Sequence, residues 1–185
     1  RARFPLTADC EITLEANPGT VDFAKFAGFK SAGITRLSLG IQSFNDAHLQ
    51  ALGRIHSGAN AQNAARAASD IFARVNFDLM YGLPNQTEKE ALNDLQTALS
   101  FSPTHLSCYQ LTLEPHTAFF AQPPALPEDD DCDKMGEAIQ NYLREYGFIH
   151  YETSAFAQNN HFCQHNLNYW HFGDYLGIGA GAHSK

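Results

Sequence analysis

The sequence repeats one local pattern along most of its length: a short apolar run, a turn, and then a helical stretch. Strands that alternate with helices need crossover connections, and such connections produce a parallel sheet. The pattern therefore predicts an α/β fold, either an open sheet or a barrel, with its functional residues at the carboxyl ends of the strands. The expected strands are Cys10–Leu14, Arg36–Leu39, Val75–Leu79 and His105–Leu111, and the expected helical stretches are Val21–Ala32, Asn45–Leu52, Ala59–Phe72 and a stretch from Thr87 through Ser100.

Capping residues mark where these helices begin and end. Thr20 is the expected N-cap of the first helix, and Gly33 is expected to end that helix. Thr87 and Glu90 have the spacing of a capping box, which predicts that a helix begins immediately after Thr87.

Polar residues stand at equivalent places within or just after the four expected strands. These residues are Glu15, Gln42, Asp78 and Gln110. A strand covered by helices is expected to be apolar throughout, so the four exceptions predict one shared polar site. The alternative is that each of them only caps a neighbouring helix.

The texture of the sequence changes after Leu113. Prolines mark an irregular connection over 115–127, and acidic residues over 128–133 then precede a helix expected to end near Tyr146, before Gly147. Acidic side chains stabilise a helix N-terminus, so this charge run is interpreted as solvation and dipole compensation and not as a metal site.

The segment 161–171 concentrates imidazole, thiol and aromatic side chains. Its candidate metal ligands are His161, Cys163, His165 and His171. Imidazole and thiolate bind zinc, copper and heme iron, and a flat ring-bearing ligand would account for the neighbouring Tyr169 and Trp170. The alternative is a loop whose histidines bond the backbone and whose tryptophan fills space.

Composition narrows the possible partners. With 12 Lys and Arg against 20 Asp and Glu, the net charge of -8 leaves no basic field for a phosphate backbone, so no nucleic-acid partner is expected. The apolar runs are too short to span a bilayer and no leader is visible, which predicts a soluble, cytoplasmic protein. The 4 cysteines are too far apart for a CxxC pair and are expected to be reduced.

Several motifs follow one another in a fixed order along the chain. They are Leu14-Glu15-Ala16-Asn17-Pro18, Ser38-Leu39-Gly40-Ile41-Gln42-Ser43-Phe44, Leu52-Gly53-Arg54-Ile55-His56, Asp78-Leu79-Met80-Tyr81-Gly82-Leu83-Pro84, Tyr109-Gln110-Leu111-Thr112 and His165-Asn166-Leu167-Asn168-Tyr169-Trp170. In this order they resemble the coproporphyrinogen III oxidase-like branch of the radical S-adenosylmethionine (SAM) superfamily. The last two motifs narrow the resemblance to the HemW-type heme chaperones.

The resemblance implies a fold, a domain division and site residues. The fold would be a partial radical SAM (β/α)6-type barrel of parallel strands, with its βα units in 1–113. Residues 114–185 would supply the final barrel helix and strand, the start of the C-terminal region, and a heme-associated His-Asn-x-x-Tyr-Trp segment. By position in the motifs, the SAM-binding residues correspond to Glu15, Gln42, Arg54 and Asp78, and the heme-associated residue corresponds to His165. Carboxylate and amide oxygens can accept hydrogen bonds from the ribose and amine of SAM, and Arg suits its carboxylate.

One departure from the family pattern concerns the iron–sulfur cluster. The CxxxCxxC motif that holds a [4Fe-4S] cluster in the superfamily is absent, and no cysteines in this chain have that spacing. We therefore expect the chain to be an internal fragment of a longer protein, with neither cluster nor catalytic activity of its own.

The function that the resemblance implies is that of a heme chaperone. The full-length protein would bind heme, pass it to hemoproteins, and carry SAM and a [4Fe-4S] cluster in its barrel, without coproporphyrinogen oxidase activity. A membrane-associated recipient is compatible with this interpretation although the chain has no membrane segment, and the oligomeric state is left open. The alternative is an oxygen-independent coproporphyrinogen III oxidase, in which a radical abstracts hydrogen from propionate side chains and causes decarboxylation. A third interpretation is a βα scaffold whose sites have decayed.

Overall fold

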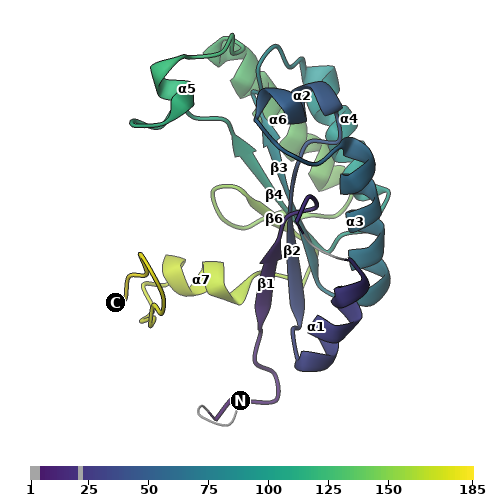
Figure 1. Ribbon diagram of the computed structural model, residues 1–185, viewed down its shortest axis with the longest axis vertical. Coiled ribbons are helices and arrows are strands. Elements are labelled where there is room, and N and C mark those ends of the chain that lie inside the picture. The colour runs from purple at the N-terminus through teal and green to yellow at the C-terminus, as the bar shows by residue number, and fades with distance from the viewer. Residues whose placement is uncertain (1–4, 21–22) are drawn as a thin grey trace.

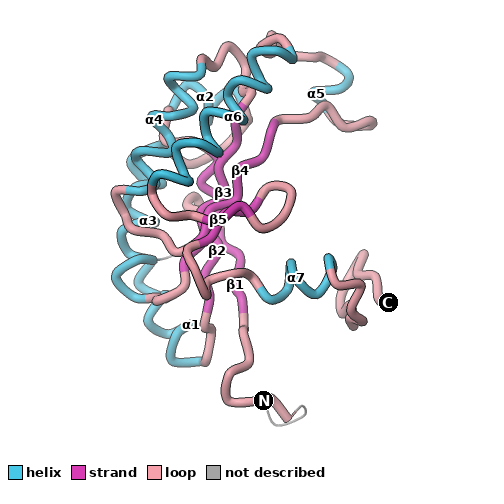
Figure 2. Tube along the Cα trace, turned by 180° about the vertical axis from the view of Figure 1, so that it is seen from behind, coloured by secondary structure: helices cyan, strands magenta, loops and turns pink. Residues whose placement is uncertain are grey.

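The computed structural model describes residues 5–20 and 23–185, and within them the strands form one 6-stranded sheet. Helices cover one face of this sheet, and the C-terminal segment lies on the opposite side (Figures 1 and 2). The strand order is β1-β2-β3-β4-β6-β5. The chain thus forms a curved α/β layer with one face covered and the other open.

The first part of the sheet is parallel, as the repeated pattern predicts. Its strands are β1 (Thr13–Ala16), β2 (Arg36–Gln42), β3 (Val75–Tyr81) and β4 (His105–Gln110). β1 begins later than expected because the backbone of Ile12 bonds the Thr35 side chain as well as the backbone of Thr35 and Arg36. The α/β fold with parallel strands is therefore confirmed for these units.

Four helices bury the outer face of the parallel strands. They are α1 (Phe26–Ala32), α3 (Gly58–Ile71), α4 (Glu88–Leu99) and α6 (Asp129–Glu145). The buried face of α3 consists largely of alanines, which let the helix axis approach the strands closely. Against them pack apolar strand residues such as Leu37, Phe77 and Leu106, each 0% exposed. Removing this surface from water supplies the main driving force for folding, about 25 cal/mol per Å².

The sheet departs from the expected parallel pattern after α6. Two short strands, β5 (Ile149–His150) and β6 (Ala155–Ala157), pair antiparallel to one another, and β6 pairs antiparallel to β4. The physical reason is the short connection between them, since a few residues can join only antiparallel neighbours. As a result the chain leaves β6 at the amino-terminal end of β4, where Ala157 pairs with His105.

The segment beyond β6 ends in α7 (Gln164–Trp170), which projects away from the open face of the sheet (Figure 1). The remaining elements are the 3-10 helix η1 (Phe23–Lys25) and the short helices α2 (Asp46–Ala51) and α5 (Ala118–Ala121). None of the described helices is long and apolar enough to cross a membrane.

The capping predictions are confirmed at the start of α4 and at the end of α1, and wrong at the start of α1. The Thr87–Glu90 capping box is present at the start of α4, and Gly33 ends α1 with a left-handed φ of 103°. Thr20 is not the N-cap of α1, because that helix begins at Phe26 and Thr20 forms a turn with Asn17. The expected helical positions 21 and 22 lie outside the described residues.

Candidate functional site

Side chains alternate between two environments along the parallel strands. In β2, residues 37, 39 and 41 face the helices, while Arg36, Ser38 and Gln42 face the open side. β3 and β4 follow the same alternation, with Asn76 and Asp78 opposite His105 and Ser107. Alternation places every second residue of a strand on one face, so the open face of the sheet is polar across three neighbouring strands.

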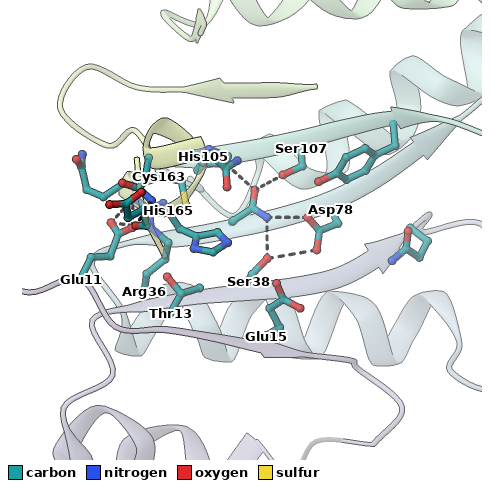
Figure 3. A pocket seen from close by; sticks show the side chains of 17 residues that line it. Glu11, Thr13, Glu15, Arg36, Ser38, Asp78, His105, Ser107, Cys163 and His165 are labelled. Carbon is teal, nitrogen blue, oxygen red and sulfur yellow. Dashed lines mark hydrogen bonds and ion pairs between the residues drawn. The ribbon is translucent and has the colours of Figure 1, made fainter. Parts of the chain in front are cut away.

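This polar face forms one side of a cavity of about 900 Å³ (Figure 3). The other side is supplied by α7, by Cys163 just before it and by Asp174 after it. The lining residues are Glu11, Thr13, Glu15, Arg36, Ser38, Gln42, Asn76, Asp78, His105, Ser107, Tyr109, Cys163, Gln164, His165, Asn166, Asn168 and Asp174. The cavity is large enough for a nucleoside-sized ligand and rich in hydrogen-bonding groups.

A continuous set of hydrogen bonds crosses the floor of the cavity. The Asn76 Nδ2 amide donates to Ser38 Oγ and to Asp78 Oδ1, both at 2.8 Å. Ser38 Oγ in turn donates to Asp78 Oδ2 at 3.3 Å, and Ser107 Oγ donates to Asn76 Oδ1 at 3.2 Å. Asp78 therefore stands in the middle of the sheet as the final acceptor of a polar network.

Burial changes the acidity of two residues in this network. Burial raises the pKa of Asp78 above its ordinary value, and hydrogen bonds from Asn76, Ser107 and Ser38 partly offset that rise. Burial lowers the pKa of His105 to about 3, with a smaller contribution from the positive charge of Arg36. His105 is therefore neutral at physiological pH.

An ion-pair network closes the amino-terminal end of the cavity. Arg36, which is 1% exposed, donates from Nε and Nη2 to Glu11 Oε2 at 3.1 and 3.0 Å. Its Nη2 also donates to the carbonyl oxygens of His161 and Phe162, and Glu11 Oε1 accepts from the backbone N–H of Gln164. These contacts attach the segment before α7 to the sheet, so α7 begins at a fixed point of the cavity wall.

The structure brings together most of the residues that the sequence singles out. Glu15, Gln42, Asp78 and His165 all line the cavity, the first three from the sheet and the last from α7. Gln42 ends β2 at a bulge, with a left-handed φ of 67°. His165 is exposed, and its ring meets that of Tyr169 edge-on at 4.8 Å between centroids.

Two polar residues singled out by sequence lie elsewhere. Arg54 is exposed in the loop after α2 and does not line the cavity, although its neighbour His56 contacts the Ile41 carbonyl oxygen at the end of β2. Gln110 pairs with Tyr81, one position beyond the pair Met80–Tyr109, and so faces the helices near Gly82. The expectation that Gln110 shares the polar site is wrong, because a shift of one residue along a strand changes its face.

The residues that line the cavity floor are not among the site residues that the sequence predicts. These residues are Arg36, Ser38, Asn76, His105, Ser107 and Tyr109. Their signal is present in the sequence as strict alternation, for example in Val75-Asn76-Phe77-Asp78-Leu79. This alternation does not by itself indicate a site, because parallel strands are normally buried on both faces, whereas here helices cover only one.

The described residues fit an organic ligand better than a metal ion. Among them, no group of three or more His, Cys, Asp and Glu side chains could hold a metal ion, and the four cysteines are all free. The chain's own residues thus do not fit a [4Fe-4S] cluster. By contrast, the carboxylates and amides of the cavity match the amine and hydroxyl donors of SAM.

Comparisons with known proteins agree with this architecture. The model of the radical SAM superfamily matches residues 2–98, a little over half of the chain. The heme chaperone HemW of Escherichia coli is 53% identical over the whole chain, which covers 49% of that protein. HemW of Haemophilus influenzae is 56% identical over 95% of the chain, which covers 46% of that protein. The chain therefore spans about half the length of these curated relatives.

A solved structure shows the same fold. Coproporphyrinogen III oxidase (HemN) from Escherichia coli, a radical SAM enzyme, superposes with a TM-score of 0.83 and 24% identity over 99% of this chain and 46% of its own. That identity supports the fold alone. The family match, the parallel βα units and the polar cavity together show that the chain belongs to the radical SAM superfamily.

Proposed function

We propose that this chain forms the ligand-binding half of a heme chaperone, which binds heme, transfers it to hemoproteins, and carries SAM in its barrel. The observation that carries the proposal is that one cavity is lined by Glu15, Gln42 and Asp78 from the sheet and by His165 from α7. Identity above 50% to two heme chaperones along nearly the whole chain supports this assignment.

The sheet side of the cavity is suited to SAM. Asp78 and Glu15 supply carboxylate acceptors, and Gln42 supplies an amide held at the end of β2. SAM brings a positively charged sulfonium and an ammonium group, and a carboxylate that accepts from the ammonium N–H forms a strong, charge-assisted hydrogen bond. Arg54, in the exposed loop after α2, remains a candidate for the SAM carboxylate by its place in the motif. A [4Fe-4S] cluster, when bound, would supply electrons, and its ligands would come from outside this chain.

The α7 side of the cavity is suited to heme. His165 offers an exposed imidazole at the start of the helix, and Tyr169 and Trp170 are 44% and 54% exposed. An imidazole is a usual axial ligand of heme iron, and exposed aromatic rings can pack against a porphyrin. The recipients would be hemoproteins of the cytoplasm or of a membrane surface.

Hemin titration of the full-length protein tests the heme assignment, with the Soret band as readout. His165→Ala should abolish the shift of the Soret band seen with the unchanged protein, because an axial ligand is lost. His116→Asn is the matched control, since His116 is exposed, lies outside the cavity lining, and has a left-handed φ of 66° that Asn tolerates. Equal spectra for His165→Ala and the control would remove His165 from the site, and Cys163 would be tested next.

Calorimetry tests the SAM assignment. Asp78→Ala should weaken SAM binding about ten- to hundredfold, because a charge-assisted hydrogen bond contributes about 1.5–3 kcal/mol. An unchanged affinity would leave Asp78 as a structural residue of β3. The same measurement on Arg54→Ala decides whether Arg54 takes part in SAM binding.

The alternative function, an oxidase, is distinguished from a chaperone by the product that it would form. An oxygen-independent coproporphyrinogen III oxidase would decarboxylate coproporphyrinogen III in the presence of SAM and a reductant. The likeness to HemN supports the fold only, whereas the higher identity is to the chaperones. We therefore expect hemin binding without decarboxylation, and formation of the decarboxylated porphyrinogen would favour the enzyme.

A further inference from the structure

We propose that a directional chain of hydrogen bonds couples the two ligand positions, so that a ligand held by Asp78 and a ligand held beside His165 raise each other's affinity. The inference rests on the proposed function, because it takes SAM as the first ligand and heme as the second. It assigns His105 and Tyr151 as positioning residues, since they act through Asp78 and the start of α7.

Four hydrogen bonds in series connect α7 with the middle of the sheet. The backbone N–H of Cys163, the N-cap of α7, donates to Tyr151 Oη at 3.2 Å. Tyr151 Oη lies 2.6 Å from His105 Nε2, and His105 Nδ1 lies 2.7 Å from Asn76 Oδ1. Asn76 Nδ2 then donates to Asp78 Oδ1 at 2.8 Å.

The number of available donor hydrogens fixes the direction of this series of hydrogen bonds. Both hydrogens of Asn76 Nδ2 are used by Ser38 and Asp78, so Asn76 Oδ1 must be the atom that accepts from His105 Nδ1–H. His105 Nε2 is then unprotonated and accepts from the Tyr151 hydroxyl. Burial raises the pKa of Tyr151 to about 12 and lowers that of His105 to about 3, so both are neutral and every donor points toward Asp78.

The same series of hydrogen bonds can also run in the opposite direction, but fewer donors then find an acceptor. If Asp78 is protonated, its hydroxyl can donate to a turned Asn76 amide, and His105 must then carry its proton on Nε2. Tyr151 Oη would accept from both His105 and Cys163, which leaves its own proton without an acceptor in the chain. The charge on Asp78 thus selects between two discrete arrangements, and such a two-state element can carry coupling between sites.

Tyr151 transmits the selected arrangement to α7. Its ring packs against Phe162 at 4.8 Å and against His105 at 5.5 Å, and its hydroxyl receives the N–H of Cys163. His165 follows Cys163 by two residues within the first turn of the helix. Its hydroxyl therefore adds to the contacts of Arg36 and Glu11 that hold the start of α7, and it accepts from Cys163 more strongly when its own proton is donated to His105.

The sign of the coupling follows from these arrangements. A cationic ligand that donates to Asp78 keeps this carboxylate ionised, which stabilises the fully satisfied direction and the anchored start of α7. By linkage, a heme that fixes α7 must favour the same ligand at Asp78 by the same factor. Because one neutral hydrogen bond limits the transmitted free energy, the expected factor is about two- to tenfold.

A linkage experiment with two tyrosine variants tests the coupling. The SAM dissociation constant of the full-length protein is measured by calorimetry with and without saturating hemin. In Tyr151→Phe the aromatic ring is kept, but the hydroxyl that joins Cys163 to His105 is lost. In the control Tyr142→Phe, the lost hydroxyl is not part of this series of bonds: it contacts Tyr146 Oη, just after α6, at 3.2 Å, and the side chain of Gln96. We expect the two- to tenfold gain with hemin in the unchanged protein and in the control, and no gain in Tyr151→Phe.

Hydrogen exchange over residues 161–168 gives a readout that needs no heme. SAM should slow exchange there in the unchanged protein and in Tyr142→Phe, but not in Tyr151→Phe. If SAM and hemin both bind and the affinities are independent, or if Tyr151→Phe keeps the full gain, the coupling is overturned while the proposed function stands. A protein that binds neither ligand overturns the proposed function, and the coupling with it.

Discussion

At the scale of single residues, the cavity depends on a glycine at which an added side chain would displace a lining residue. Gly40 lies on β2, and a Cβ added there would stand 2.8 Å from Asn17 Oδ1 and 3.0 Å from Gln42 Nε2. Both atoms are the ends of side chains that can turn away. An added methyl group is therefore expected to displace Gln42 from the cavity without unfolding the strand.

Gly40→Ala should weaken SAM binding about tenfold, the equivalent of one well-placed hydrogen bond, while urea unfolding changes by less than about 1 kcal/mol. The control is Gly28→Ala in α1, where an added Cβ meets nothing within 4 Å. This control should keep SAM affinity and gain about 0.5–1 kcal/mol of stability from helix propensity. Unchanged SAM affinity in Gly40→Ala would show that Gln42 does not contact the ligand.

The sequence predicts some cavity residues and misses others for a physical reason. Glu15, Gln42 and Asp78 stand out because a polar residue interrupts an apolar run. His105 and Ser107 do not, because their importance depends on pairing with β3 across the sheet. Arg54 belongs to a recognisable motif, yet no sequence pattern reports that its side chain is exposed.

At the scale of elements, α4 holds the loop that follows β2. Asp94 on α4 is 5% exposed and accepts from Ser43 Oγ at 2.6 Å and from the backbone N–H of Phe44 at 2.7 Å. These bonds fix the two residues directly after Gln42. The helix thus supports the candidate site without touching the cavity.

Asp94→Ala should lower the free energy of unfolding by about 3 kcal/mol, since two hydrogen bonds to a buried carboxylate are lost. Urea titration measures this, with the exposed Asp70→Ala on α3 as control, expected within about 0.5 kcal/mol of the unchanged protein. A loss as small as that of the control would mean that the loop after β2 is held by other contacts.

Element prediction succeeds where the pattern is local. The βα units and the capping box at Thr87 follow from residues close in sequence. The antiparallel β6 does not, because three residues, Ala155–Ala157, carry no periodicity and their direction is set by pairing with β4. The start of α1 also differs from the prediction, since α1 begins at Phe26 and Thr20 forms a turn with Asn17.

At the scale of the whole molecule, the buried polar face makes stability depend on pH. The pKa of His105 falls from the ordinary 6.5 to about 3 in the folded chain. Between pH 6.5 and about 3 the unfolded chain therefore binds a proton at His105 that the folded chain does not. Stability is lost as the pH falls through this range. The raised pKa of Asp78 acts in the opposite direction, because its protonation favours the folded state.

Between pH 7 and pH 5, His105 should cost about 2 kcal/mol of stability, which follows from 1.36 kcal/mol per pKa unit. Urea titrations of the unchanged protein and of His105→Gln at both pH values measure this contribution as a difference in slope. Gln does not titrate, so its stability should fall less on acidification. Identical slopes would mean that His105 is protonated in the folded state.

The reversal of the chain at β6 has a kinetic consequence. It places α7 at the amino-terminal end of the parallel strands, whereas Gln42 lies at the carboxyl-terminal end of β2. SAM and heme, bound as proposed, would lie toward opposite ends of these strands, so neither would have to leave before the other. Binding can then follow a random order, and a ternary complex forms without a compulsory sequence of arrival or departure.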